Sequence, residues 1–269
     1  MDLHVHSNVS DGTDTPAELV NKAADAGIGM LAISDHDAIG GVEDARKTAN
    51  EKDIILIPSV EMSCKYEEEL HILGLDIDPD SAPIREMLEE VNFKRKDRNR
   101  KMLRKLEDAG YRIGPFMENP AVLTRAHFAT ALVEAGYADN VSDAFRKFVG
   151  DNAPYYIKRE LLPPKEVIDT ILAGGGLPVL AHPCLMRGNT DLLIHELTDM
   201  GLLGIEAYYS KSTEGQTQHY RNIARQNHLF VTCGSDYHGT RKPDITLGQG
   251  WEPADDLKAC REMLFERCK

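Results

Sequence analysis

Seven short apolar runs, most of them followed by a stretch with helical periodicity, constrain the fold of this 269-residue chain more than any other feature. Apolar runs of this length are typical of buried strands, and strands that alternate with helices predict a parallel sheet. The first helix has clear boundaries, because Thr15 fits an N-cap, Pro16 the first helical position and Gly27 the helix stop. The predicted strands span residues 2–6, 30–34, 54–60, 70–75, 177–181, 204–208 and 229–233.

Side chains of the kind that bind metal ions stand on or directly after nearly every predicted strand. His4 and His6 are two residues apart on the first strand, so their imidazoles point to the same side and can hold one divalent cation. In a parallel barrel the carboxyl ends of the strands meet at one face, where barrel enzymes carry their active sites. We therefore expect a multinuclear metal site in the mouth of a seven-stranded barrel. The other candidate ligands are His36 after the second strand, Glu61 after the third, His71 on the fourth, His182 after the fifth, and Asp236 and His238 after the seventh.

Four further acidic residues are open to two interpretations. Glu206, on the sixth strand, either belongs to the barrel mouth or is a structural charge. Asp2, Asp35 and Asp37 each lie close in sequence to a candidate ligand, where a carboxylate can orient an imidazole through its second nitrogen. Ordinary turn or capping roles fit these three aspartates equally well.

Strand signals stop near residue 79 and resume near residue 164, and helical signals fill the interval. Helices are predicted over residues 83–109 (one or two helices), 125–134 and 142–149, followed by Gly110, Gly136 and Gly150. The sequence therefore predicts a barrel from residues 1–78 and 164–269 and an inserted helical subdomain from residues 79–163. An insertion of this kind is expected to cap the barrel mouth and to select the substrate.

Basic residues concentrate inside this insertion, although the net charge of the chain is −13. Residues 94–105 include eight basic side chains, which form either a solvated helix face or a phosphate-binding surface. Arg125 with His127, and Lys158 with Arg159, are sharper candidates for contacts with a substrate phosphate. The acidic balance argues against duplex DNA as a partner but remains compatible with a small phosphorylated substrate or a short single strand of RNA.

Cysteine usage and hydropathy indicate the compartment. Five cysteines are scattered without a C-x-x-C pair, which favours reduced thiols and a cytoplasmic location. No apolar run approaches the roughly 18 residues that span a membrane, and the chain begins with a strand and a histidine motif instead of an export signal. We therefore expect no membrane partner, and the sequence leaves the oligomeric state open.

Six ordered motifs resemble those of the polymerase and histidinol phosphatase (PHP) family, and within it the stand-alone bacterial branch. The resemblance runs from the first predicted strand to the last and implies an α/β fold, a distorted (β/α)7 barrel related to TIM barrels, with an inserted α-helical cap. The motifs occupy residues 2–12, 34–37, 60–63, 71–74, 181–183 and 234–238, with residues 124–127 and 204–210 typical of the branch.

The resemblance also implies a cluster of up to three divalent cations. Some family members have a histidine where this chain has Asp11, and the harder oxygen ligand favours manganese or iron over zinc. We expect two or three ions, with Mn2+ as the first choice and Fe2+ or Zn2+ as alternatives. Carried over position by position, the first group of ligands is His4, His6, Glu61 and Asp236; the second group is Glu61, His71 and His182; the third group is Asp11, His36 and His238.

This arrangement predicts a metal-dependent phosphoesterase in which a metal-bridging hydroxide attacks phosphorus. The cations that Glu61 and Asp236 would hold activate the water and neutralise the phosphate oxygens. The leaving oxygen needs a proton or a cation, which either the third ion or a histidine such as His127 would supply.

The expected substrate is a small phosphorylated nucleotide or ribose derivative, with a nucleoside 3',5'-bisphosphate as the first choice. Alternatives within the class are a phosphodiesterase acting on 5-phosphoribosyl 1,2-cyclic phosphate and a 5'-to-3' exonuclease acting on short RNA. Outside the class, a non-catalytic metal-stabilised module and a metal amidohydrolase remain open, although the basic cluster disfavours the amidohydrolase.

Overall fold

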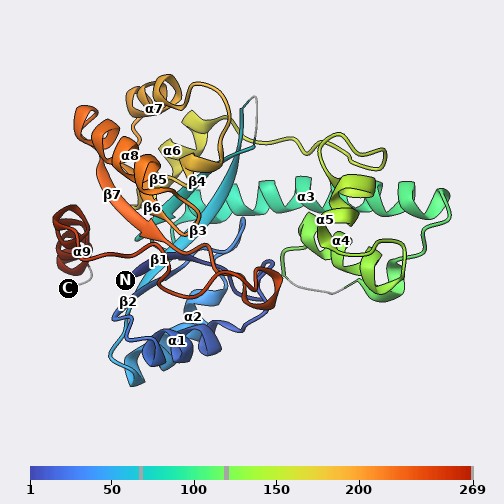
Figure 1. Ribbon diagram of the computed structural model, residues 1–269, viewed down its shortest axis with the longest axis horizontal. Helices are drawn as coiled ribbons and strands as arrows, with labels where there is room; N and C mark the ends of the chain where they lie inside the picture. The colour runs from blue at the N-terminus through green and yellow to red at the C-terminus, as the bar shows by residue number, and fades with distance from the viewer. Residues whose placement is uncertain (67–68, 118–120, 268–269) are drawn as a thin grey trace.

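The computed structural model describes residues 1–66, 69–117 and 121–267, and within them seven strands form one curled sheet in the order β1 to β7 (Figure 1). The segment after β7 closes most of the barrel by returning to β1: the His6 amide donates to the Tyr237 carbonyl at 2.9 Å, and the Asp236 amide to the His4 carbonyl at 2.8 Å. This confirms the predicted barrel. The strands are β1 (Asp2–Val5), β2 (Met30–Ile33), β3 (Ile55–Lys65), β4 (Glu69–Leu75), β5 (Leu177–Leu180), β6 (Gly204–Tyr209) and β7 (Phe230–Gly234).

One strand corrects the expectation of an all-parallel barrel. β4 pairs antiparallel with both β3 and β5, whereas the other neighbouring strands are parallel. Three residues separate β3 from β4, and a parallel crossover needs about a dozen. The reversed strand places its amino end at the barrel mouth, which is why His71 lies near the start of β4. The hairpin also lengthens β3, so Glu61 lies inside this strand and not after it.

The helices around the barrel follow the predicted pattern. Thr15 caps α1, Pro16 is the first helical residue, and Gly27 has a φ of 72° just beyond the end, all as predicted; the Glu18 side chain completes a capping box with Thr15. In Figure 1, α1 and α2 lie on one side of the sheet and α6, α7 and α8 on the other. The barrel helices are α1 (Pro16–Asp25), α2 (Gly41–Glu51), α6 (Pro164–Ala173), α7 (Thr190–Asp199), α8 (Glu214–Gln226) and α9 (Asp255–Arg267).

The insertion has a hydrophobic core of its own. Leu106 of α3 and Phe128 of α4 belong to this second core, whereas Ile84 and Met87, near the start of α3, pack in the barrel core. One continuous helix therefore connects the two cores, and it crosses from the barrel to the helical group in Figure 1. The division at residues 79 and 163 stays a prediction. The elements are α3 (Ala82–Asp108), the 3-10 turn η1 (Gly114–Phe116), α4 (Arg125–Glu134), α5 (Val141–Ala144) and the π-helical turn η2 (Phe145–Val149).

Two further expectations concern thiols and membranes. Cys64, Cys184, Cys233 and Cys260 are free thiols, and Cys268 lies outside the described residues. Among the helices of the described residues, none is both long enough and apolar enough to cross a membrane.

Candidate metal centre

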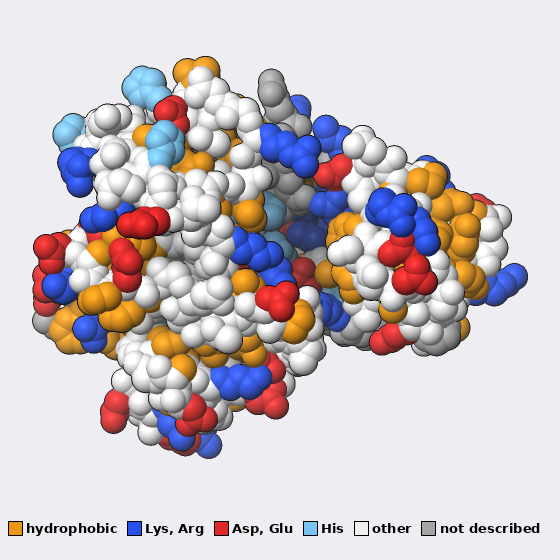
Figure 2. Space-filling view, viewed as in Figure 1, with side chains coloured by type: hydrophobic (Ala, Val, Ile, Leu, Met, Phe, Trp, Pro, Cys, Tyr) orange, Lys and Arg blue, Asp and Glu red, His pale blue; other side chains and the backbone are white. Residues whose placement is uncertain are grey.

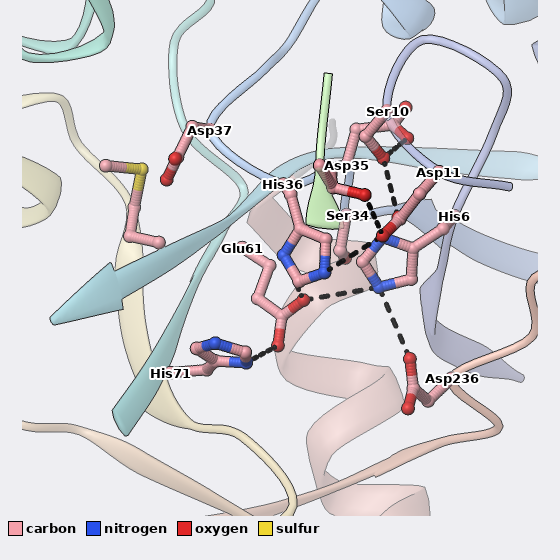
Figure 3. A network of polar contacts seen from close by, with 12 residues as sticks. His6, Ser10, Asp11, Ser34, Asp35, His36, Asp37, Glu61, His71 and Asp236 are labelled. Carbon is pink, nitrogen blue, oxygen red and sulfur yellow. Dashed lines mark hydrogen bonds and ion pairs between the residues drawn. The ribbon is translucent and has the colours of Figure 1, made fainter. Parts of the chain in front are cut away.

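Glu61 lies at the centre of the barrel mouth, buried, with its two carboxylate oxygens facing different sets of imidazoles (Figure 3). Oε1 is 2.8 Å from Nδ1 of His71 and 2.9 Å from Nε2 of His182. Oε2 is 3.4 Å from Nε2 of His4 and 3.3 Å from Nε2 of His6. A carboxylate with this environment is placed to bridge two cations.

The first group is completed by Asp236, just beyond β7. Its Oδ1 lies 3.4 Å from Nε2 of His6. The Nε2 atoms of His4 and His6 are 3.1 Å apart. Ligands held about 2.1 Å from one cation at tetrahedral or octahedral angles stand about 3.0–3.4 Å apart. Two of the three separations fall in this range, and the third, 3.9 Å between Asp236 Oδ1 and His4 Nε2, is wider, so one ion bound by all three would have an enlarged angle between these two ligands.

Two residues that sequence reasoning missed hold the other oxygen of Asp236. The Tyr209 hydroxyl donates to Oδ2 at 2.7 Å, and the Lys242 ammonium donates to it at 2.6 Å. Oδ1 is thereby left to face the histidines. Both partners are brought in by tertiary contacts, although Tyr209 stands three residues after Glu206 in a motif of the resemblance.

The third group gathers at the ends of β1, β2 and β7. Asp11 Oδ1 is 3.4 Å from His238 Nε2, and Asp11 Oδ2 is 3.8 Å from His36 Nε2. His6 also reaches this group, since its Nδ1 is 3.8 Å from Asp11 Oδ1. From the resemblance, His6 was expected in the first group alone. A neutral imidazole has one lone pair to give, so His6 can ligate in one group while its N–H faces the other.

Buried polar atoms without a hydrogen bond of good geometry support a cation site here. Among the described residues, His6 Nδ1, His36 Nδ1 and Glu61 Oε2 are buried and make no hydrogen bond, although His36 Nδ1 lies 2.9 Å from Glu61 Oε2 as an ion pair. Such atoms are rare in folded proteins and need an explanation. A cation bound between these side chains would satisfy the carboxylate oxygen and the imidazole lone pairs that face it. The cluster of histidine, aspartate and glutamate side chains is thus able to bind metal ions.

The protonation states of Glu61 and His6 suit ligation. Burial alone would raise the pKa of Glu61, but the imidazoles of His71, His36 and His4 hold it well below its usual range. Burial, together with the charge of His238, lowers the pKa of His6 to about 4, so this ring is neutral at pH 7. Ionised carboxylates and neutral imidazoles are the forms that bind metals. At His4 and His36 burial lowers the pKa, but the neighbouring carboxylates outweigh burial and raise it, so a bound cation would replace a proton there.

Glu206 on β6 supports His4 from behind. Its Oε1 is 3.1 Å from His4 Nδ1, and its Oε2 accepts the His182 amide at 2.7 Å. A carboxylate at Nδ1 favours a proton on that nitrogen and turns the lone pair of Nε2 toward the cation. Of the two interpretations that the sequence left open, the structure favours the one that places Glu206 at the site.

We expect Glu206→Gln to weaken binding of the cation that His4 would hold, because the neutral amide no longer fixes the tautomer. The loss should be about 10- to 100-fold in affinity, measured by titrating Mn2+ into metal-free protein in a calorimeter. Glu196→Gln, at an exposed position of α7, serves as the matched control. Unchanged affinity in Glu206→Gln would show that Glu206 is only a structural charge.

Asp2 and Asp35 hold loops instead of imidazoles. Asp2 accepts the amides of Ser235 at 2.9 Å and Gly248 at 2.8 Å. Asp35 accepts the Ser7 amide at 2.9 Å and a hydroxyl from Ser10. These contacts favour the turn interpretation for both residues. Asp37 differs from them, because its buried carboxylate forms ion pairs with two arginines of the insertion.

A cavity of about 1310 Å3 opens between the ligand cluster and the insertion. Figure 2 shows lysine and arginine side chains gathered around this hollow, with histidine at its floor. Candidate ligands of the barrel thus form one wall and cationic side chains of the insertion form another, and Lys65 and Arg187 of the barrel add two further cations to the lining. The ligand wall includes Asp11, His36, His71 and His182, and the cationic wall includes Lys94, Arg95, Arg98, Arg125, Lys158 and Arg159.

Three of the four predicted phosphate contacts line this cavity. Arg125 forms an ion pair with Asp151 and lies over the ring of Tyr156, with 5.3 Å between the guanidinium carbon and the ring centre. Lys158 and Arg159 belong to the same wall. Arg159 is also paired with the buried carboxylate of Asp37, and contact of these three residues with a substrate phosphate stays a prediction.

The structure gives His127 a different position. The ring is buried and lies outside the cavity lining. His127 Nδ1 accepts the Thr124 amide at 3.0 Å and so closes the capping box of α4. The third position of a helix directs its side chain back toward the N-cap, which explains this placement.

Arg98 of α3 is a cavity residue that sequence reasoning did not single out. It is 5% exposed, donates to Met102 Sδ at 3.3 Å, and forms no ion pair with a carboxylate of the described chain. Burial, together with the charges of Arg95 and Arg159, lowers its pKa to about 9. Helical spacing could have identified Arg98 from the sequence, because Arg95 and Arg98 share a face with the buried apolar residues of α3.

Comparison with known proteins gives the class first: the chain belongs to the PHP domain family, whose model matches residues 2–173. It is a metal-dependent phosphoesterase of this family, as the motifs predicted. Among its relatives, the 5'-3' exoribonuclease Rnm of Salmonella typhimurium is 34% identical over 268 residues, which cover 94% of this chain and 90% of the relative. The 3',5'-nucleoside bisphosphate phosphatase of Chromobacterium violaceum is 32% identical over 248 residues, which cover 88% and 87%.

A solved structure shares the whole fold. It is described as an amidohydrolase from Chromobacterium violaceum with bound sulfate and no metal. The two chains superimpose with a TM-score of 0.89 and 29% identity, over 99% of this chain and 96% of the other.

Proposed function

We propose that this enzyme removes a phosphate from a small nucleotide or ribose derivative that carries a second phosphate, with a nucleoside 3',5'-bisphosphate as the first candidate. The observation that carries the proposal is the cavity with candidate metal ligands on one wall and six cationic side chains of the insertion on another. A substrate with two phosphate groups can meet both walls at once. The sulfate in the related Chromobacterium violaceum structure supports a site for tetrahedral anions.

The proposal assigns a separate task to each wall. Bound divalent cations, two or three in number and manganese by preference, supply an activated water and neutralise the charge that develops on the phosphate. Glu61 fixes the spacing of the first and second groups, and Asp236 is held toward the first group by Lys242 and Tyr209. Cations such as Arg125 bind the phosphate that does not react and so hold the reacting phosphate in a fixed position next to the metal ligands.

A second candidate is a 5'-to-3' exonuclease acting on short RNA. The cavity is larger than about 1,000 Å3, the upper end of ordinary small-molecule pockets. The Salmonella typhimurium relative also carries the name of an exoribonuclease. We place the enzyme in the cytoplasm, where its described free thiols would stay reduced.

A panel assay tests the proposal directly. Manganese-loaded protein is incubated with a nucleoside 3',5'-bisphosphate, a mononucleotide, a 5'-phosphorylated RNA of a few nucleotides and a cyclic ribose phosphate, and the products are resolved by chromatography. We expect the highest kcat/KM for the bisphosphate. A preference for the RNA or for the cyclic phosphate would replace the substrate assignment, and no hydrolysis of any compound would favour a non-catalytic metal-stabilised module.

A further inference from the structure

We propose that the helical insertion holds two ligands of the third group, Asp11 and His36, so that seating of the insertion and binding of the third cation are one coupled event. The inference rests on the proposed metal role of the third group. It gives the insertion a task beyond covering the cavity, because the insertion then becomes part of the metal centre.

The first contact joins the start of α4 to Asp11. The Thr124 hydroxyl donates to Asp11 Oδ2 at 3.0 Å, and both side chains are buried. Beside it, the Val122 amide donates to the Val9 carbonyl at 2.9 Å. Because Oδ2 is held by the insertion, Oδ1 is the oxygen that faces His238, at 3.4 Å.

The second contact joins α3 to the residue after His36. The carboxylate of Asp37 is fully buried and forms ion pairs with Arg95 of α3 and with Arg159. The Asn92 side chain donates to the Asp37 carbonyl at 2.8 Å. Asp37 has a φ of 50°, a conformation that a non-glycine residue keeps only when its surroundings enforce it. The insertion supplies the partners of the Asp37 side chain and carbonyl, and the barrel supplies the partner of its amide, which donates to the Glu61 carbonyl at 3.0 Å.

The first two groups are anchored within the barrel. His4, Glu61 and His71 lie within β1, β3 and β4, where the hydrogen bonds between strands fix the backbone. The other three ligands follow their strands, but their backbone amides donate to barrel residues: His6 to the Tyr237 carbonyl, Asp236 to the His4 carbonyl and His182 to the Glu206 carboxylate.

Asp11 follows β1 in a loop, and loops are mobile unless they are tied down. His36 lies just beyond β2, where its backbone forms a β-bridge with Glu61. The insertion adds a contact to each segment, through Thr124 at Asp11 and through Arg95, Arg159 and Asn92 at Asp37. The third group therefore depends on the insertion in a way that the other two groups do not.

Coupling of this kind is reciprocal. If seating of the insertion raises the affinity of the third cation, that cation stabilises the seated insertion by the same factor. Loss of one supporting hydrogen bond to a ligand is expected to lower cation affinity about 10- to 100-fold. The effect should fall on the third cation alone.

The test compares Mn2+ binding to metal-free wild type, Thr124→Val and Thr124→Ser by calorimetry and by electron paramagnetic resonance of free Mn2+. We expect wild type to bind three ions, Thr124→Val to bind the weakest one about 10- to 100-fold less tightly, and Thr124→Ser to restore it. Serine keeps both the helix cap and the donor to Asp11. Asn92→Ala, which acts through Asp37, should give the same selective loss.

Hydrogen exchange supplies an independent readout on the same proteins. Saturating Mn2+ should slow amide hydrogen exchange in α4 of wild type. In Thr124→Val the same addition should slow this exchange by a smaller factor. Equal weakening of all ions, unchanged affinities in both Thr124→Val and Asn92→Ala, or a wild type that binds only two ions would each overturn the inference. A wild type that shows the expected binding but hydrolyses no phosphoester would instead overturn the proposed function and leave the coupling in place.

Discussion

Glu61→Gln is expected to abolish turnover and to weaken two cation groups together. The carboxylate faces His4 and His6 with one oxygen and His71 and His182 with the other. A neutral amide offers one oxygen in place of two charged ones, so it cannot bridge. Metal ions are worth several kcal/mol to a phosphoryl transition state, and 1.36 kcal/mol is tenfold in rate, so kcat should fall by about 10³-fold or more.

The measurement pairs kcat on the preferred substrate with elemental analysis of bound manganese after gel filtration. Glu166→Gln, on the exposed face of α6, controls for the chemical change, and circular dichroism confirms that each variant is folded. Asp236→Asn should lose manganese from the first group only. Full manganese content in Glu61→Gln would contradict the bridging assignment.

Arg98→Met should impair substrate capture without harming the fold. Arg98 is a buried cation in the cavity wall without a carboxylate partner in the described chain, so an anionic substrate is the partner that its position favours. Hydrogen bonds to charged groups contribute about 1.5–3 kcal/mol, so KM for a bisphosphate should rise about 10- to 100-fold. A mononucleotide, which lacks the second phosphate, should show a much smaller change.

Arg98→Met should leave the free energy of unfolding unchanged or raise it. Because the folded state lowers the pKa of Arg98 to about 9, the charged form is favoured less in the folded chain than in the unfolded chain. At neutral pH this charge opposes folding, and methionine removes it. Thermal melts and steady-state kinetics of Arg98→Met are compared with those of Arg100→Met, an exposed position on the same helix. An unchanged KM for the bisphosphate would remove Arg98 from the substrate site.

Local signals predicted much of the fold correctly. Local residues such as Thr15 and Gly110 determine the cap of α1 and the ends of α3 and α4, so these features could be identified without tertiary information. The convergence of the candidate ligands followed from their positions at the ends of strands. The direction of β4 is not encoded in its own residues. The feature that indicates it is the short connection from β3, which is too short for a parallel crossover.

The missed parts of the site depend on contacts between segments distant in sequence. Lys242 and Tyr209 matter because of where Asp236 lies, and Glu206 could be assigned only when His4 was seen beside it. His127 was placed at the substrate from a motif, but its helix position turns the ring toward its own N-cap. Residue type and spacing thus indicated the kind of chemistry, and tertiary packing decided which side chains take part.

The continuity of α3 limits how the cavity can exchange its contents. This helix has 27 residues, which is about 40 Å at 1.5 Å per residue, and one end is embedded in each core. A lid that swings open needs a hinge, commonly a few residues in a loop. A continuous helix that packs in both the barrel core and the insertion core offers no hinge along its length. Substrate and product are therefore expected to pass through the open side of the cavity, and seating of the insertion against Asp11 and Asp37 is expected to involve local movement near α4 and not a swing of the whole insertion.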